Sequence, residues 1–416
     1  MLNSNLVKMK PEGESATMVT KKRTTIWNRG YTCAFFANLL LCFSQNTVNP
    51  LISTYATWLG AGAVLVGTIS GLYFGVAFAA RPISGPAITV LDRKKLMIAT
   101  YSLGFLTNIL YAMAGSVPVF IAARCIHGLQ FAFVGSLNLV IASDSLPREK
   151  LGSGIGIFGI GGALATAIGP SVGIAVRRWG EMRWGEGAGY TAVFLAGALF
   201  MLLGVIPCVL LPMKKQTKAE RAKLGKWYQN ILAVETIPPA ILLGLVSISN
   251  ILYSTYMVPY AAELGIENIG LFFTVYAVFL LGARPLFGRL SDRVGMDKVM
   301  YPALVIFALS FVAVGFGRSM TWMLVGAVLD ALGYGALNPT IQTLCIRTVE
   351  AERRGVASNT EYFGMDLGYF VGPMLGGVLY RSGGYAEMYL IGGIAPLVLA
   401  FLIFALTWGR MKNRLY

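Results

Sequence analysis

The sequence predicts an all-α polytopic membrane protein with twelve transmembrane helices. Of its 416 residues, 56% are hydrophobic and 13% are charged, and the mean hydropathy is +0.65, whereas a soluble domain carries about 25% charged residues. The apolar residues form twelve runs of roughly twenty or more, each long enough to cross the hydrocarbon core of a bilayer. The runs are continuous and do not alternate in polarity, which excludes a closed β-barrel.

The predicted spans form two groups of six on either side of a basic segment, Met213–Glu235. The first six spans are Gly30–Trp58, Val64–Ile88, Leu96–Ala114, Val117–Ala142, Gly152–Val176 and Ala188–Leu211. The second six are Ile237–Ala262, Gly270–Leu290, Val299–Gly317, Thr321–Ile346, Gly355–Tyr380 and Ala386–Trp408. The domains predicted from them are a tail (1–29), a six-helix bundle (30–212), a linker (213–236), a second six-helix bundle (237–409) and a tail (410–416).

The charges of the loops predict the orientation. If the N-terminus is cytoplasmic, 26 of the 34 Lys and Arg residues lie on the cytoplasmic side and five lie on the opposite side. Cytoplasmic loops are enriched in Lys and Arg, so we expect both termini to be cytoplasmic. The same rule accounts for the net charge of +15 without nucleic-acid binding. The basic linker is then either an ordinary cytoplasmic loop or a helix on the anionic inner leaflet.

The two groups repeat one another at an offset of 203 residues. Glycine matches alone are weak evidence in a chain with 49 glycines, but two X-Pro pairs also match at this single offset. The matches are Arg81-Pro82 with Arg284-Pro285, Gly85 with Gly288, and Gly169-Pro170 with Gly372-Pro373. Two parallel six-helix halves related by an axis along the membrane normal are an arrangement of secondary transporters.

A glycine-rich charged turn in the second half carries a family resemblance. Gly288-Arg289-Leu290-Ser291-Asp292-Arg293-Val294-Gly295, followed by Lys298, is similar to the loop signature of the major facilitator superfamily. In the first half Gly85 is kept, but Thr89 and Val90 occupy the Asp and Arg positions. The resemblance implies conformational latches at the cytoplasmic helix ends. The latch residues that we expect are Arg81, Gly85, Asp144, Arg284, Gly288, Asp292 and Arg293, with Asp144 capping its helix or pairing with loop arginines.

Two further motifs fit this family. Arg124, His127 and Gly128 match an Arg-polar-Gly signature on the fourth helix, and Gly368–Gly377 has the form G-x-x-x-G-P-x-x-G-G. The second motif resembles that of twelve-helix drug:proton antiporters, although there it belongs to the fifth helix. In this chain the fifth helix, with Ala165, Gly169-Pro170 and Gly173, lacks both flanking glycines.

Ionisable residues inside predicted spans are costly and are therefore functional candidates. They are Arg124, His127, Asp330, Glu361 and Asp366. Asp366 lies roughly 16 Å along its helix from Gly355, near mid-bilayer, and is the first candidate for protonation. Glu361 is turned about 140° from Asp366, so the two acids are not expected to share a pocket wall. For each residue a structural interhelical contact is the alternative role.

Polar and aromatic stripes at helical spacing add further candidates, because residues three, four or seven apart share a helix face. The resemblance implies that helices one, four, seven and ten line the central cavity. The stripe residues are Asn38, Gln45 and Asn49 on helix one, Asn250 and Tyr253 on helix seven, Tyr334 and Asn338 on helix ten, and Tyr362 on helix eleven.

The sequence argues against an enzyme. Gly169-Pro170-Ser171-Val172-Gly173 fits the nucleophile pattern G-x-S-x-G, but no strand precedes it and His127 is the only histidine. No phosphate-binding G-x-x-x-x-G-K-[ST] loop is present. We expect no metal and no cofactor.

The function expected from these residues is secondary active transport. The leading prediction is proton-coupled efflux of an amphipathic drug or metabolite by a monomer in the plasma or inner membrane, with the small-molecule substrate, protons and the lipid bilayer as partners. One alternative is proton-coupled uptake of an organic acid or sugar, and another is a non-transporting membrane scaffold or receptor.

Overall fold

The computed structural model describes residues 25–212, 230–266, 269–413 and 415. All regular secondary structure in these residues is helical, which confirms the predicted all-α class. Most of the predicted N-terminal tail and of the linker 213–236 lies outside the described residues.

The helices before residue 212 follow the predicted spans with several interruptions. They are α1 (Arg29–Val48), η1 (Asn49–Leu51), α2 (Ile52–Trp58), α3 (Ala63–Val90), α4 (Arg93–Ala112), α5 (Val117–Asp144), η2 (Arg148–Lys150), α6 (Leu151–Phe158), α7 (Ile160–Trp184) and α8 (Glu186–Leu210). The predicted span Gly30–Trp58 is divided because Pro50 lies in the 3₁₀ turn η1, where its missing N–H cannot continue an α-helix.

The helices after residue 230 are longer and less interrupted. They are η4 (Val234–Thr236), α10 (Ile237–Glu263), α11 (Gly270–Val294), α12 (Met296–Gly317), α13 (Met320–Arg347), η5 (Ala351–Arg353), α14 (Arg354–Glu387), the π-helical turn η6 (Met388–Gly393) and α15 (Ile394–Lys412). Gly295 alone separates α11 from α12, with a φ of 101° that favours glycine. Gly185, with a φ of 90°, makes the same kind of turn between α7 and α8.

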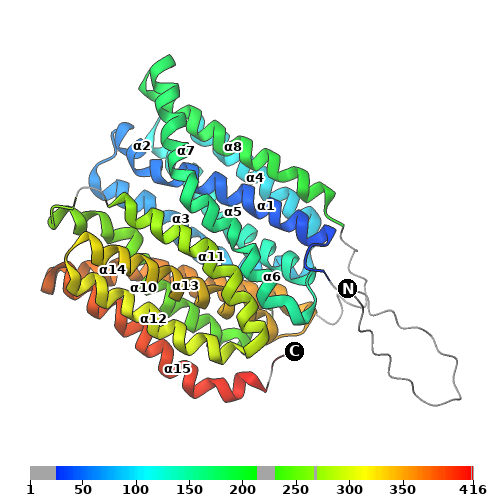
Figure 1. The fold of residues 1–416 in the computed structure, drawn as a ribbon. Coiled ribbons are helices and arrows are strands. Elements are labelled where there is room, and N and C mark those ends of the chain that lie inside the picture. Colours follow the sequence, from blue (N-terminus) through cyan, green and yellow to red (C-terminus); the bar gives the residue numbers. More distant parts are fainter. Residues whose placement is uncertain (1–24, 213–229, 267–268, 414, 416) are drawn as a thin grey trace, which may run out of the picture.

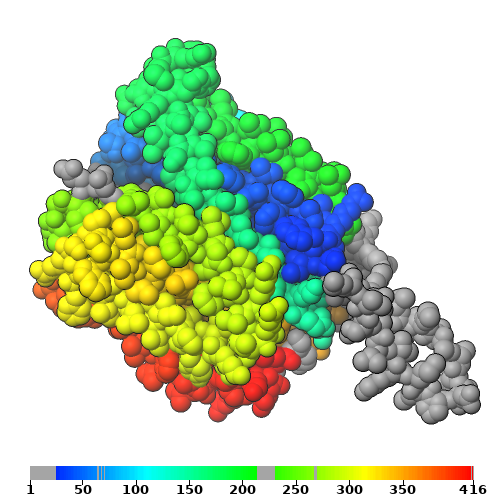
Figure 2. All heavy atoms as spheres, in the orientation of Figure 1, coloured from blue at the N-terminus to red at the C-terminus, as the bar shows by residue number. Residues whose placement is uncertain are grey.

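The helices gather in space as they do in the sequence. Figure 1 shows α1–α8 on one side of the molecule and α10–α15 on the other. The largest buried hydrophobic cluster is drawn from residues 242–411, and the next two come almost entirely from residues 31–211. The two groups meet where α3 packs on α14 and where α6 and α7 pack on α11. The turn from α7 to α8 projects beyond the rest of the molecule (Figure 2), with Trp184 and Met182 exposed.

The outer surface is apolar, as expected for helices surrounded by lipid. Large side chains such as Leu199 of α8, Val278 of α11 and Leu406 of α15 are more than half exposed. In the described part of the chain, eight helical segments are long and apolar enough to cross a membrane, and one of them, Ala351–Lys412, joins α14, η6 and α15. The twelve separate spans stay a prediction.

Candidate functional site

Polar contacts between the two groups of helices concentrate near one end of the bundle. At this end, which we call the Asp144 end, α3, α5, α11 and α13 finish and α4, α6, α12 and α14 begin. Among the described residues, the side-chain hydrogen bonds and ion pairs that join the two groups all lie in the half of the bundle nearer this end. We describe these contacts from the middle of the bundle outward.

The deepest contact is an ion pair between Arg81 of α3 and Asp366 of α14. The Arg81 Nε lies 2.8 Å from the Asp366 Oδ2, and both side chains are fully buried. Arg81 Nη1 donates to the carbonyl oxygen of Ala132 and to the Ser136 Oγ, both at 2.8 Å. A buried charge is tolerated when it is paired and hydrogen-bonded. Arg81 and Asp366 provide each other with the opposite charge and with one hydrogen bond.

Two aromatic rings, one from α14 and one from α5, lie against the Arg81 side of the ion pair. The Arg81 guanidinium lies 4.8 Å from the ring centre of Tyr362 and 5.8 Å from that of Phe131, which is cation–π distance. The pair is not fully satisfied, because Arg81 Nη2 and Asp366 Oδ1 have no hydrogen-bond partner in the described part of the chain. The ion pair can therefore offer one donor and one acceptor to a further group.

The structure corrects the expected position of Arg81. We predicted a latch residue at a helix end, but Arg81 lies inside α3, which continues through Pro82 and Pro86 to Val90. Membrane helices tolerate interior proline when neighbouring groups satisfy the freed backbone. Arg284 is likewise inside α11, which continues through Pro285, and its Nη1 donates to the carbonyl oxygen of Gly159.

Nearer the Asp144 end, two turns before Asp366, Asn359 of α14 joins the two groups. The Ser84 Oγ donates to Asn359 Oδ1 at 2.7 Å, and Asn359 Nδ2 donates to the carbonyl oxygen of Arg81 at 2.8 Å. A Cβ on Gly85 would lie 2.6 Å from Asn359 Nδ2, so a larger residue at position 85 would displace the Asn359 side chain from its hydrogen bonds to α3. The matching glycines predicted Gly85, whereas its partner Asn359 could not be assigned from the sequence.

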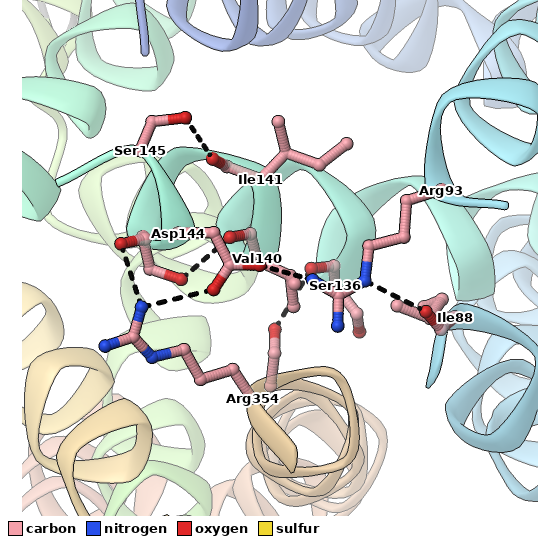
Figure 3. Close-up of polar contacts among 10 residues, drawn as sticks. Ile88, Arg93, Ser136, Val140, Ile141, Asp144, Ser145 and Arg354 are labelled. Atoms are coloured by element: carbon pink, nitrogen blue, oxygen red, sulfur yellow. Dashed lines mark hydrogen bonds and ion pairs between the residues drawn. The ribbon is translucent and has the colours of Figure 1, made fainter. Parts of the chain in front are cut away.

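Asp144 holds three helices together at their ends (Figure 3). It is the last residue of α5 and ion-pairs with Arg93 at the start of α4 and with Arg354 at the start of α14. The Arg354 Nη1 lies 3.1 Å from the Asp144 Oδ1 and also donates to the carbonyl oxygen of Ser143. Asp144 therefore pairs with arginines, as we expected. Arg354 belongs to the opposite group of helices, so this contact also crosses between the groups.

Asp292 caps the start of α6 from the opposite group. It accepts hydrogen bonds from the backbone N–H of Gly152 (3.0 Å) and of Ser153 (2.6 Å) and from the Ser153 Oγ (2.6 Å). Arg347 of α13 pairs with the same carboxylate at 3.1 Å. A carboxylate at a helix N-terminus satisfies N–H groups that have no partner within the helix.

The backbones of the two groups also meet closely beside Asp292. A Cβ on Gly288 would lie 2.5 Å from the carbonyl oxygen of Gly152, so this contact depends on the absence of a side chain. Arg293, which also belongs to the predicted loop signature, is exposed at the end of α11.

The predicted basic residues of the first group form a separate cluster. Arg124 donates from Nη1 to Asn49 Oδ1 (3.1 Å) and from Nε to the carbonyl oxygen of Ile69 (3.2 Å). Its guanidinium lies 4.7 Å from the ring centre of Tyr73, and Gln45 Nε2 donates to the Tyr73 hydroxyl. His127 Nδ1 lies 3.2 Å from the Tyr111 hydroxyl. Asn38, nearer the Asp144 end, accepts a hydrogen bond from Asn138.

Asp330 occupies a buried position in the second group. Only 1% of the residue is exposed, it makes no ion pair in the described part of the chain, and its Oδ1 has no hydrogen-bond partner there. Tyr253 and Tyr276 lie within electrostatic reach of its carboxylate. The hydroxyl of Tyr253 forms a hydrogen bond with that of Ser310, and Asn250 is a polar neighbour of Tyr276.

Two tyrosines continue this polar path toward the other group. The Tyr334 hydroxyl lies 3.1 Å from that of Tyr369 and accepts from Asn338 Nδ2. Tyr369 in turn packs edge-on against Phe74 of α3, with 5.5 Å between the ring centres. Tyr334 and Asn338 of α13 thus lie together, as their spacing of four residues predicts.

Glu361 and Asp366 face different surroundings, as the helical angle between them predicts. Asp366 points toward Arg81, whereas Glu361 is fully buried with Gln342 as a polar neighbour. No group of three or more His, Cys, Asp and Glu side chains converges as a metal site within the described ranges.

Comparison with known proteins gives one consistent family. The family model described as Major Facilitator Superfamily matches residues 34–267 and 239–414. Multidrug resistance protein MdtG of Escherichia fergusonii is 27% identical over 407 residues, covering 93% of this chain and 96% of the relative. The protein of the same name from Klebsiella pneumoniae is 25% identical over 382 residues, covering 88% of this chain and 90% of the relative.

Solved structures with the same fold are more distant in sequence. The human organic anion transporter MFSD10 has a TM-score of 0.72 at 16% identity, with 90% of this chain and 98% of that chain covered. The proton:xylose symporter XylE has a TM-score of 0.75 at 14% identity, with 91% and 94% covered.

Proposed function

The chain belongs to the Major Facilitator Superfamily of membrane transporters, and we propose that it is a secondary active transporter that exports an amphipathic drug or metabolite in exchange for protons. It is thus a multi-span membrane transport protein and not an enzyme. The two MdtG relatives, whose name includes multidrug resistance, support export, as does the antiporter-like motif Gly368–Gly377.

The proposed architecture is a monomer of two six-helix halves in the cell membrane, 30–212 and 237–409, related by pseudo-symmetry. The linker 213–236 and the tails 1–29 and 410–416 are cytoplasmic in this proposal. The loop charges support this orientation, since every lysine then lies on the cytoplasmic side. The Asp144 end is in that case the cytoplasmic end.

The observation that carries the proposal is the ion pair between Arg81 and Asp366. It joins α3 to α14, and therefore the first half to the second, in a fully buried position. The charged form of a buried carboxylate depends on its cationic partner. Protonation of Asp366 would remove that attraction, so a proton and the cytoplasmic closure of the transporter are linked through one carboxylate.

This link gives a cycle of alternating access. With Asp366 ionised, the pair with Arg81 and the contacts of Asn359, Asp144 and Asp292 hold the cytoplasmic end closed. A proton that arrives from outside neutralises Asp366 and favours opening to the cytoplasm. The proton is then released inside, the substrate binds, and the ion pair forms again as the cytoplasmic end closes. Protons and substrate move in opposite directions.

The remaining polar candidates receive roles in this cycle. Asp330 with Tyr253, Tyr334, Asn338 and Asn250, and Arg124 with His127, Asn49, Gln45 and Asn38, are proposed to bind substrate or a second proton. Tyr362, one turn before Asp366 on α14, is proposed to cover the Arg81 guanidinium, and Glu361 is a second candidate for protonation. Gly85, Gly288, Arg284 and Arg293 belong to the cytoplasmic closure.

A flux experiment tests the proposal. A ligand found by a thermal-shift screen is loaded into proteoliposomes, and its movement is followed under a pH gradient of either direction. We expect wild-type protein to drive the ligand against the proton flow and the Asp366→Asn variant to lose gradient-driven movement. Glu181→Gln is the control, because this carboxylate forms an exposed pair with Arg177 outside the site.

Other outcomes would change the proposal in defined ways. Accumulation of the ligand in the direction of proton flow would establish uptake by symport in place of export. Unchanged proton-driven flux in Asp366→Asn would exclude this carboxylate from coupling. Binding without flux of any ligand in the wild type would favour a membrane scaffold or receptor.

A further inference from the structure

An apolar groove of about 410 Å³ lies between α10 and α14. Three residues of α10, Ile241, Leu245 and Ile248, form one wall, and three of α14, Phe363, Leu367 and Val371, form the other. The groove opens to the outside of the bundle, since Ile241 is 46% exposed and Leu367 is 43% exposed. Both helices belong to segments able to cross a membrane, so the groove faces the hydrocarbon of the bilayer.

The two helices that form the groove meet backbone to backbone along its floor. A Cβ on Gly364 would lie 2.2 Å from the carbonyl oxygen of Ala240, and a Cβ on Gly368 would lie 2.3 Å from that of Gly244. Small residues allow such close helix approach in membranes. The larger side chains on either side of this glycine contact then form the walls.

Only an apolar group suits the groove. Thr360 is the one polar side chain among its lining residues, and its hydroxyl already donates to Val356 and accepts from the backbone N–H of Ala233. Between Ile237 and Ile248, which both line it, the groove extends about 16 Å along α10. This length is about half of the roughly 30 Å hydrocarbon core, the depth of one leaflet.

One residue connects the groove to the buried ion pair. Phe363 lines the groove and stacks on Phe78 of α3, with 4.4 Å between ring centres and 29° between planes. Phe78 precedes Arg81 by one helical turn, and Phe363 precedes Asp366 by one turn, so each ring shares a helix face with one member of the ion pair. The two rings therefore stand next to the ion pair on the side of the groove.

We propose that this groove binds the alkyl chain of an amphipathic substrate dissolved in the inner leaflet, and that the Phe78–Phe363 pair closes the passage from the groove to Arg81 and Asp366. The inference rests on the proposed function and names its substrate class, a compound with one alkyl chain and a polar head. When the two rings separate, the head reaches the unpartnered Arg81 Nη2 and Asp366 Oδ1. The substrate enters from the bilayer and not from the aqueous cytoplasm.

Photolabelling tests the groove directly. The full-length protein in lipid vesicles is exposed to dodecylamine that carries a diazirine near the end of its chain. We expect labelled peptides from both walls, 237–248 and 360–371, and competition by excess unlabelled dodecylamine. A diazirine-bearing phosphatidylglycerol, used in parallel, distinguishes a membrane lipid from a substrate and should label the outer helices without this preference.

A filled groove provides the matched comparison. Leu367→Trp places a larger ring on a partly exposed wall without touching the glycine contact. It should reduce labelling roughly 15- to 50-fold if it excludes two or three methylene groups. Leu402→Trp, on the exposed face of α15, should leave labelling unchanged. Phe78→Ala should extend labelling to the residues around Asp366. Equal labelling of Leu367→Trp and wild type, or a signal from phosphatidylglycerol that dodecylamine does not displace, would overturn the inference.

Flux measurements separate this inference from the proposed function. If a pH gradient drives dodecylamine out of wild-type and Leu367→Trp vesicles equally, and faster than out of protein-free vesicles, the groove is not on the substrate route, but the transporter assignment stands. If the groove is labelled and competed while no gradient-driven flux occurs, the groove remains an amphiphile site and the export proposal fails.

Discussion

The most demanding prediction concerns the ion pair between Arg81 and Asp366. Replacing Asp366 with Asn leaves the Arg81 guanidinium fully buried beside a neutral amide. Breaking a buried pair by removing one partner costs about 3–5 kcal/mol. We expect the lower end of this range, about 3 kcal/mol, because the Asn side chain can still accept the Arg81 Nε–H. A cost of this size is more than a hundredfold in an equilibrium constant, at about 1.4 kcal/mol for each factor of ten.

The cost has two measurable consequences. If the protein stays closed at the Asp144 end, the midpoint of thermal unfolding in detergent should fall by about 3–4 °C, because the entropy of unfolding scales with the number of residues. If it opens there, Arg81 gains water and the population shifts toward the open form. Spin-label distances between cysteines introduced at the starts of α4 and α14, which lie at the Asp144 end, measure that shift. Either result, or a mixture of the two, fits the structure.

Two further variants show whether pairing is the cause. Arg81→Met alone should cost at least as much as Asp366→Asn, since it also removes the hydrogen bonds to Ala132 and Ser136. The double variant Arg81→Met/Asp366→Leu should recover most of the loss, because a buried ion pair replaced by apolar residues is often close to neutral. The exposed-pair control Glu181→Gln should change stability by less than about 1 kcal/mol. An Asp366→Asn variant that matches this control in both assays would refute the reasoning.

Three other variants test the remaining contacts. Asp292→Ala removes four hydrogen bonds and should destabilise the closed form by about 3 kcal/mol. The loss should appear as faster hydrogen exchange in α6, and unchanged exchange there would contradict the capping role. Gly288→Leu should also speed exchange in α6, because its Cβ would lie 2.5 Å from the carbonyl oxygen of Gly152, and a wild-type exchange pattern would show that the two backbones do not need to touch. Asp330→Asn should leave the unfolding midpoint within about 2 °C of wild type or raise it, since this acid has no ion pair to lose among the described residues; a fall as large as that of Asp366→Asn would reveal a cationic partner.

The sequence alone determined the class of the protein and much of its organisation. Inside a bilayer a long, continuous apolar run can satisfy its backbone hydrogen bonds only as a helix. Composition and run length were therefore sufficient to predict the all-helical membrane class. The charged turn Gly288–Gly295 was sufficient for the family, which the family model confirms. The rarity of ionisable groups inside spans drew attention to Asp330, Glu361 and Asp366, and all three are buried.

Only the tertiary structure decided which of these residues meet. The repeat made Arg81 and Arg284 equivalent, with 203 residues between them, yet they have different partners. Arg81 pairs with Asp366, which is 285 residues away in the sequence. At the same offset the counterpart of Asp366 is Ala163, so Arg284 meets no carboxylate there and donates to the carbonyl oxygen of Gly159.

The physical reason is that the repeat fixes helix positions but not the contacts between side chains across the two groups. Periodicity places Arg81 and Asp366 on faces of their own helices, and it carries no information about which face of α3 packs against which face of α14. That packing is set by close contacts such as Gly85 against Asn359, where a single added Cβ would lie 2.6 Å from the amide nitrogen. A helix-end latch and a protonation candidate, predicted separately from the sequence, are joined in the folded chain as one buried ion pair.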